Sequence, residues 1–169
     1  LEFLSFRERL DAASGFQSDQ FRQLEFVLGV KSEQTLRRFP EGSRARVALE
    51  RRYRAPTLWD AFLHYLLREG YDVPQSCPGR DVIAAVEPSP DIQRIIVDVY
   101  RRDAKNAELC ERLVDLDEGV MEWRYRHVKM KQRTIGTRRG TGGSDGADFI
   151  DTTLNKTLFP DLWAIRGEL

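Results

Sequence analysis

The chain has 169 residues, of which 41% are hydrophobic, and this length and composition predict one domain over residues 1-169 with a single core. Basic and acidic residues number 27 each, which excludes a global field that would attract nucleic acid or an acidic membrane surface. The longest apolar runs are only a few residues, so a transmembrane helix is excluded, and without a signal-peptide pattern a cytoplasmic protein is expected.

Two helices are predicted at the start of the chain. Apolar residues between residues 3 and 10 recur on one helical face, and the small residues 12–15 break this helix. A second helix runs from about Ser18 to Leu28, where Gly29 supplies the C-terminal stop. Ser18 is a suitable N-cap because its hydroxyl can accept a hydrogen bond from the first turn.

Two more helices and a connection follow in the sequence. A charged helix is predicted at residues 44–54, and the Pro56-Thr57 step begins a strongly amphipathic helix that Gly70 ends. Residues 73–90 hold four of the seven prolines, so this stretch is predicted to be an extended connection.

The second half is predicted to contain two long helices. Asp91 caps one that continues through Val99, and the longest helix runs from about Lys105 to Ile135, where Gly136 closes it. No segment alternates polar and apolar residues for long enough to demand a sheet. The sequence therefore predicts an all-α fold.

One apolar stripe of the longest predicted helix includes His127. Spacings of four and three residues place its members on one helical face: Leu109, Leu113, Leu116, Val120, Trp123, His127 and Met130. An imidazole buried in such a stripe needs a partner, because an unpaired ring nitrogen there costs about 1 to 3 kcal/mol. That partner is either a backbone carbonyl, as in most core histidines, or a haem iron with His127 as its axial ligand.

Zinc is disfavoured as the partner of His127. No second ligand lies one turn away on that face, and His64 is remote in the sequence. Cys77 and Cys110 are too few for a thiolate site or a disulfide framework.

Two other features have both a structural and a functional interpretation. The glycine-rich stretch 137–146 is either a surface linker or a loop in which Thr141 and backbone N–H groups contact an anionic or zwitterionic ligand. No Lys follows its glycines, so it is not a Walker loop. Arg7 follows Phe3 by four residues on one helical face. The pair is either solvated or a clamp in which the guanidinium holds the carboxylate of an amino acid.

Several motifs together resemble the tryptophan 2,3-dioxygenase family. The run SGFQSDQFRQLE at residues 14–25 resembles the signature of that family. WRYRH at residues 123–127, followed by RTIG at 133–136 and GTGGS at 140–144, resembles the family's haem-ligand helix and the loop behind it. FP and LW at residues 159–163 are similar to the start of its C-terminal helix. These matches span nearly the whole chain in the family's order.

The resemblance implies a fold, a reaction and a site. The fold is the all-α haem-binding domain of the tryptophan/indoleamine dioxygenase type, with haem b held by His127. Arg7 would pair with the carboxylate of L-tryptophan, Phe3 would contact the substrate, and Thr141 would engage its ammonium and carboxylate groups. The implied reaction inserts both atoms of O2 across the indole C2–C3 bond and gives N-formyl-L-kynurenine. The implied assembly is a homotetramer.

One departure from the family pattern concerns the region upstream. Relatives have a segment there that supplies the distal wall, including a histidine near the indole nitrogen, and nothing in this chain matches it. His64 is no substitute, because it lies in the amphipathic helix away from any matching segment. The chain is therefore expected to be the C-terminal part of a longer protein or one chain of a split one.

Three functions remain open at this point. The favoured one is a dioxygenase that acts on L-tryptophan. The second is a related haem enzyme that acts on a modified tryptophan or another aromatic amino acid. The third is a non-catalytic helical interaction module. It is favoured if each of these features has only its structural role.

Overall fold

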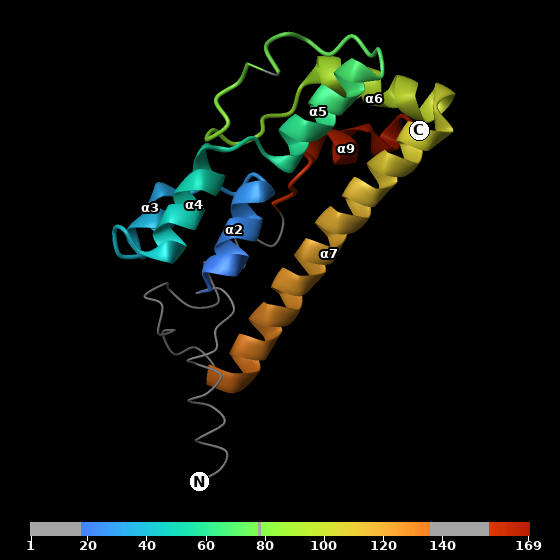
Figure 1. The fold of residues 1–169 in the computed structure, drawn as a ribbon. Coiled ribbons are helices and arrows are strands. Elements are labelled where there is room, and N and C mark those ends of the chain that lie inside the picture. The colour runs from blue at the N-terminus through green and yellow to red at the C-terminus, as the bar shows by residue number, and fades with distance from the viewer. Residues whose placement is uncertain (1–17, 78, 136–155) are drawn as a thin grey trace. The chain divides into compact units, whose positions relative to one another are not determined.

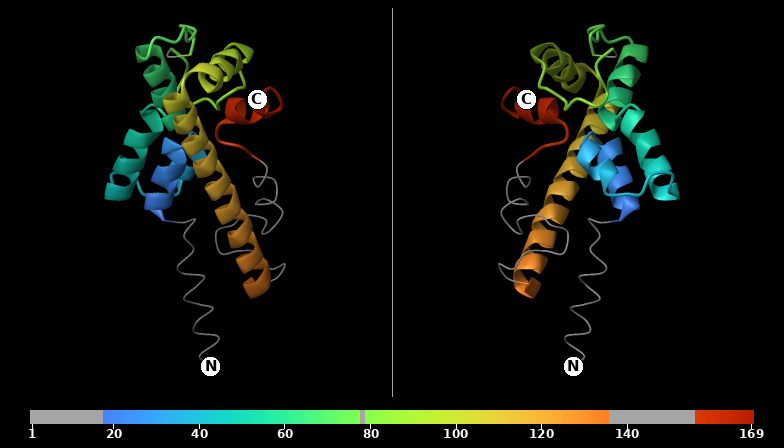
Figure 2. Two further views of the ribbon diagram at one scale, coloured as in Figure 1. Left: turned by 90° about the vertical axis from the view of Figure 1, so that its right-hand side faces the viewer. Right: turned by 90° about the vertical axis from the view of Figure 1, so that its left-hand side faces the viewer.

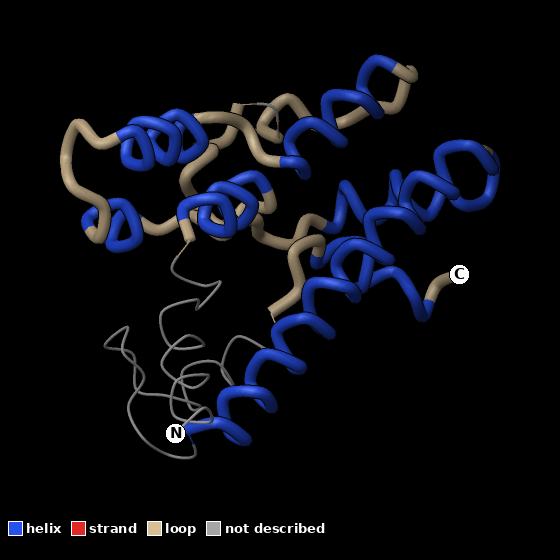
Figure 3. The backbone as a smooth tube through the Cα atoms, turned by 60° about the horizontal axis from the view of Figure 1, so that its bottom comes forward, coloured by secondary structure: helices blue, strands red, loops and turns tan. Residues whose placement is uncertain are grey.

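The computed structural model of the chain describes residues 18–77, 79–135 and 156–169. Within these ranges every regular element is a helix or a 3-10 turn, and no strand occurs (Figure 3). The all-α prediction is therefore confirmed. None of the described helices is both long enough and apolar enough to cross a membrane.

Two compact units make up the chain. One comprises Leu1–Ser18 and Leu116–Thr157, and the other comprises Asp19–Asp115 and Leu158–Leu169. The long helix α7 (Ala104–Ile135) contributes residues to both units (Figure 1). The single domain over residues 1-169 stays a prediction.

Three helices at the start of the second unit share a small core. They are α2 (Asp19–Val27), α3 (Glu33–Arg37) and α4 (Arg44–Arg54). Helices α2 and α4 lie side by side (Figure 1). Phe26, Leu36 and Leu49 are buried between the three helices, with Phe39 and Tyr53 packed against them. Helix α3 was not predicted, because five residues are too few to show a helical period.

The next two helices begin with side-chain caps. Helix α5 (Leu58–Arg68) starts with a capping box, in which Thr57 and Asp60 each accept a hydrogen bond from the other's backbone N–H. Helix α6 (Pro90–Arg102) starts two residues earlier than expected, and its N-cap is Ser89 rather than Asp91. The reason is Pro90, whose fixed φ and missing N–H suit the first helical position.

The C-terminal residues pack against α6 through a short helix, α9 (Pro160–Ala164) (Figure 2). Phe159 precedes it and stacks on Trp59, with ring centroids 5.7 Å apart. The buried carboxylate of Asp161 accepts hydrogen bonds from the backbone N–H of Ser89 at 2.7 Å and from Gln93 Nε2 at 2.9 Å. Asp161 therefore connects α9 to the N-terminus of α6.

A second polar link holds the 3-10 turn η2 (Ile165–Gly167). Arg166 Nη1 donates to Glu111 Oε1 at 2.7 Å, and the Tyr100 hydroxyl donates to the same oxygen at 2.5 Å. Burial, followed by the hydrogen bond to Glu111, raises the pKa of Tyr100. These contacts fix the end of the chain to both α6 and α7.

Helix α7 is continuous, as predicted, but its buried face differs from the predicted stripe. Leu116, Trp123 and Met130 are 38%, 37% and 44% exposed, so the prediction that they are buried is wrong. The buried side chains are those of Asn106, Cys110, Leu113, Val114, Asp117, Arg124, His127 and Val128. This face lies about one residue further along the helix and contains polar side chains, which an apolar pattern cannot identify.

Candidate functional site

His127 lies on α7 at the border between its buried and exposed faces. Its side chain is 9% exposed, and Val128 beside it is 1% exposed. The rings of Trp123 and His127 are 5.5 Å apart between centroids and inclined by 31°. Trp123 and Met130, one turn to either side, present apolar surface next to the imidazole. The ring is thus shielded from water but lies next to accessible apolar surface.

A buried arginine lies one turn before His127. Arg124 is 7% exposed, and its Nη1 donates to the backbone carbonyl of Lys156 at 3.0 Å. Arg126, two residues further on, forms an exposed pair with Glu122 instead. The two arginines therefore have different roles although they are close in sequence.

The other predicted site residues, Phe3, Arg7 and Thr141, lie outside the described residues. Their contacts with substrate stay predictions, as does the assignment of His127 as an iron ligand. In the described part of the chain, no group of three or more His, Cys, Asp or Glu side chains is arranged to hold a metal ion.

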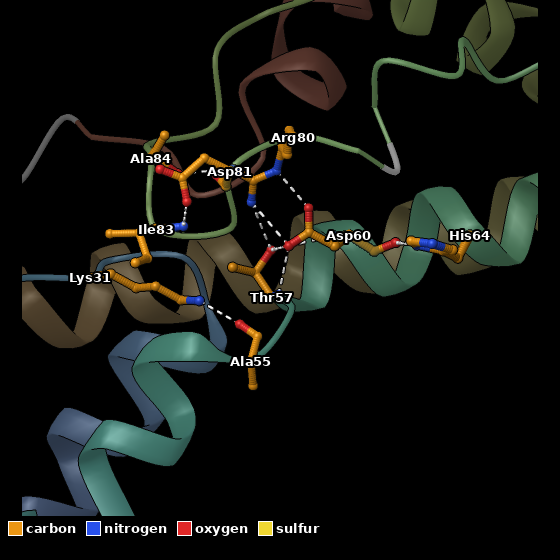
Figure 4. Close-up of polar contacts among 9 residues, drawn as sticks. All are labelled: Lys31, Ala55, Thr57, Asp60, His64, Arg80, Asp81, Ile83 and Ala84. Carbon is orange, nitrogen blue, oxygen red and sulfur yellow. Dashed lines mark hydrogen bonds and ion pairs between the residues drawn. The ribbon is translucent and has the colours of Figure 1, made fainter.

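An extensive polar cluster surrounds the start of α5 (Figure 4). Arg80, from the connection between α5 and α6, places Nε 2.5 Å from Asp60 Oδ1 and Nη2 3.0 Å from Asp60 Oδ2. The Thr57 backbone N–H and hydroxyl each donate to Asp60 Oδ2 at 2.7 Å. Asp60 is 3% exposed, so this is a buried carboxylate with a bidentate guanidinium partner.

The electrostatics of this cluster favour ionised Asp60. Burial alone would raise the pKa of its carboxyl, but the hydrogen bonds from Arg80 and Thr57 outweigh burial and hold the pKa below its usual value. Burial lowers the pKa of nearby Lys31, whose Nζ donates to the carbonyl of Ala55 at 2.5 Å. The cluster anchors the connection between α5 and α6.

Sequence reasoning missed Arg124, Arg80 and Asp161. The Thr57-x-x-Asp60 spacing of a capping box was a usable signal for one part of the cluster. No local pattern predicts that Arg80 reaches Asp60, since the two lie 20 residues apart. The residue types of the charged run WRYRH do not indicate that Arg124, rather than Arg126, is buried.

Comparison with known proteins places the chain in a family. The family model for tryptophan 2,3-dioxygenase matches residues 1–69 and 92–169. The chain belongs to the tryptophan 2,3-dioxygenase family. The resemblance inferred from the motifs is thereby confirmed. The unmatched stretch, 70–91, contains most of the connection between α5 and α6, including Arg80.

Individual members of the tryptophan 2,3-dioxygenase family are similar along the whole chain. A protein of Herpetosiphon aurantiacus with that name is 54% identical over 172 residues, covering 100% of this chain and 64% of the relative. Two proteins of the same name, from Anaeromyxobacter sp. and Anaeromyxobacter dehalogenans, are 51% and 48% identical, each covering 99% of this chain and 63% of the relative. The chain thus spans slightly less than two thirds of the length of these relatives.

Proposed function

We propose that this chain is the part of a haem-dependent tryptophan 2,3-dioxygenase that carries the iron ligand, His127. The reaction is the insertion of both atoms of O2 across the indole C2–C3 bond of L-tryptophan, with N-formyl-L-kynurenine as product. The observation that carries this proposal is the 54% identity over the full chain with a protein named tryptophan 2,3-dioxygenase. The confirmed family and the all-helical fold support it.

The donor chemistry around His127 fits haem b. A porphyrin supplies four equatorial nitrogens, so one protein imidazole is enough, whereas a bare zinc ion needs three or four protein ligands. His127 offers one largely buried imidazole, and the described residues hold no group of three or more side chains that could bind a bare metal ion. Apolar surface of Trp123 and Met130 beside the ring suits a flat apolar cofactor. When bound, the haem iron supplies the oxygen chemistry.

The roles of the protein side chains follow from their chemistry. His127 would hold the iron through a neutral imidazole nitrogen. Arg7 would form a charge-assisted pair with the substrate carboxylate, and Thr141 would contact the ammonium and carboxylate groups. Phe3 would contact the substrate without offering a hydroxyl. These three side chains orient the indole and exclude water, which reduces the entropic part of the barrier.

Turnover by the complete protein tests the proposal. The full-length protein should show a Soret band and convert L-tryptophan to N-formyl-L-kynurenine with uptake of one O2 per product. Faster turnover of a ring-substituted tryptophan would favour the related enzyme that acts on a modified substrate. A complete protein without a Soret band or turnover would favour the non-catalytic helical module.

Assembly and location remain at the level of prediction. The family resemblance implies a homotetramer, and the sequence pattern implies a cytoplasmic protein. Size-exclusion chromatography with light scattering would measure the subunit number of the complete protein.

A further inference from the structure

Two buried aspartates of the fold lie in opposite electrostatic environments. Asp60 is 3% exposed and Asp161 is 1% exposed, so neither carboxyl is open to water. Both oxygens of Asp60 accept hydrogen bonds from the guanidinium of Arg80, which balances the charge. Asp161 has no such cationic partner among the described residues. Ionisation of a buried carboxyl without a cation is unfavourable, so Asp161 has a reason to keep its proton.

The hydrogen bonds of Asp161 reach only one of its two oxygens. Oδ1 accepts from the backbone N–H of Ser89 at 2.7 Å and from Gln93 Nε2 at 2.9 Å, and both donors are neutral. Oδ2 is buried and accepts no hydrogen bond from the described part of the chain. An ionised carboxylate carries negative charge on both oxygens, whereas a protonated one has a carbonyl oxygen and a hydroxyl. The observed bonds match the protonated form, with Oδ1 as the carbonyl.

The charged groups on the neighbouring elements are engaged elsewhere. Helix α6 and the turn η2 pack against α9, and Phe159 joins it to α5. The ion pairs on these elements are Asp91–Arg94, Asp98–Arg102, Arg166–Glu111, Arg80–Asp60 and Lys105–Glu69. The tyrosines Tyr65 and Tyr100 donate to Asn106 and Glu111, and the exposed groups are His64, Arg68, Glu87 and Arg101. None of these groups contributes to the pKa of Asp161, which burial raises against the hydrogen bonds from Ser89 and Gln93.

Asp161 lies where the C-terminal segment meets α6. It is in the first turn of α9, and both of its hydrogen-bond donors are at the start of α6. An ionised carboxylate would regain hydration most directly if α9 moved away from this end of α6 and admitted water. The stack of Phe159 on Trp59 still holds the segment on one side of α9. The pair of Arg166 with Glu111 holds it on the other. The opening would therefore be local to α9.

We propose that Asp161 is a proton-controlled clasp: as a neutral acid it holds α9 on α6, and α9 loosens when the proton on Oδ2 is lost to water. The folded pKa of Asp161 is raised, so the stability that it contributes is complete below its unfolded pKa of 3.8. This contribution is lost as the pH rises through the folded value. The C-terminal segment is therefore held more tightly in acid. The inference does not depend on haem or on the proposed dioxygenase activity.

One variant and a matched control test the clasp in the full-length protein. Asp161→Asn keeps a carbonyl oxygen for the two donors of α6 but cannot ionise. Asp98→Asn removes a carboxylate from α6 that pairs with Arg102 instead, so it changes the charge of the helix without touching the clasp.

The first measurement is hydrogen exchange in a peptide from residues 162–169, at a series of values between about pH 4 and pH 8, after correction for the intrinsic pH dependence of exchange. Protection should fall about tenfold for each unit by which the folded pKa of Asp161 exceeds 3.8. A peptide from α4, which carries neither donor, should keep its protection. Protection should be independent of pH in Asp161→Asn, and Asp98→Asn should behave like the unmodified protein.

Constant protection of residues 162–169 in the unmodified protein, or an equal loss in Asp161→Asn, would overturn the inference. If Asp161→Asn does not fold, the pH profile of the unmodified protein against its α4 peptide still decides.

The second measurement is an NMR titration of the aspartate side-chain carboxyl carbons. The signal that is missing from Asp161→Asn belongs to Asp161, and its midpoint in the folded protein should lie above 3.8. A midpoint at or below 3.8 would show that Asp161 is ionised in the closed fold and would overturn the clasp.

Discussion

Asp60 shows how a single buried charge is stabilised in this fold. Its carboxylate is 3% exposed and accepts hydrogen bonds from the Arg80 guanidinium and from the hydroxyl and backbone N–H of Thr57. Removing one partner of such a group costs more than the pair contributes, because the remaining charge loses both its partner and access to water. Loss of Arg80, which lies in the connection between α5 and α6, should therefore destabilise the fold strongly.

Arg80→Met should lower the free energy of unfolding by about 3 kcal/mol, since it leaves Asp60 buried without its guanidinium. Urea unfolding followed by circular dichroism measures this change. Arg37→Met is the matched control, because Arg37 pairs with Glu33 on the surface of α3 and exposed pairs contribute little to stability. Equal losses in the two variants would show that the Asp60–Arg80 pair is not the cause.

The pH dependence of stability follows from the depressed pKa of Asp60. A carboxyl with a lowered folded pKa contributes stability that is complete above its unfolded pKa of 3.8 and is lost as the pH falls through the folded value. Burial raises the pKa of Asp161, so its contribution has the opposite sign: it is complete below 3.8 and is lost as the pH rises through the folded value.

Asp60→Asn should therefore remove the part of the acid-induced loss of stability that Asp60 causes. Urea midpoints at a series of pH values below neutrality measure the pH dependence of stability for the unmodified protein and for the Asp60→Asn variant. The variant should be less stable near neutrality, and the difference between the two proteins should shrink on acidification. A constant difference at all pH values would mean that Asp60 does not titrate differently in the folded state.

Arg7 is the residue for which a kinetic effect is expected. It lies outside the described residues, and the expectation rests on the resemblance and on the proposed function. Arg7→Ala should raise KM for L-tryptophan about 10- to 100-fold, because a charge-assisted pair contributes roughly 1.5 to 3 kcal/mol. Steady-state kinetics of the complete protein measure the change, with Arg37→Ala as a surface control. An unchanged KM would reject the carboxylate clamp.

At the level of elements, the long periodic segments were predictable and the side-chain environment along them was not. Helices α5 and α7 follow the predicted ranges within a residue or two, because caps and glycines mark their ends. The buried face of α7 was misplaced because Asn106, Asp117 and Arg124 are buried and polar. Tertiary partners decide such burial, and a single sequence does not contain them.

The candidate site shows the same division. His127 was predicted to be buried, and it is, but through a face shared with Arg124 and Val128 rather than with Trp123 and Met130. The link from Arg124 to Lys156 spans 32 residues, so no local motif could have predicted it. The motif resemblance indicated which segment carries His127. Only the structure shows which side chains lie next to it.

Gly119 offers a test of helix α7 itself. It is an exposed residue in the helix interior, and an added Cβ would meet no atom within 4 Å. Gly119→Ala should therefore stabilise the protein by about 0.5 to 1 kcal/mol, since glycine loses more backbone entropy on folding. Thermal unfolding measures the shift. Gly70→Ala is the opposite control: its φ of +94° ends α5, and alanine there should destabilise.

For the whole molecule, the division into two units predicts that local stability and cofactor binding are separable. Arg80 and Asp60 lie in the unit formed by Asp19–Asp115 and Leu158–Leu169, whereas His127 lies in the other. Changes at sites that share no partners usually add. Arg80→Met should then lower the stability of the apoprotein without changing the additional stability that haem provides.

His127→Ala should instead remove the stabilisation that haem provides to the complete protein. A ligand that binds only the folded state stabilises it by about 2.7 kcal/mol at 100 times its Kd, and this increment should disappear with the imidazole, together with stoichiometric haem retention. His64→Ala is the control, because His64 is exposed on α5 and its Nδ1 contacts the carbonyl of Asp60. Thermal unfolding with and without haem, alongside the Soret absorbance, measures both quantities. Haem retained at native affinity by His127→Ala would reject the ligand assignment and leave the stability predictions for the other unit intact.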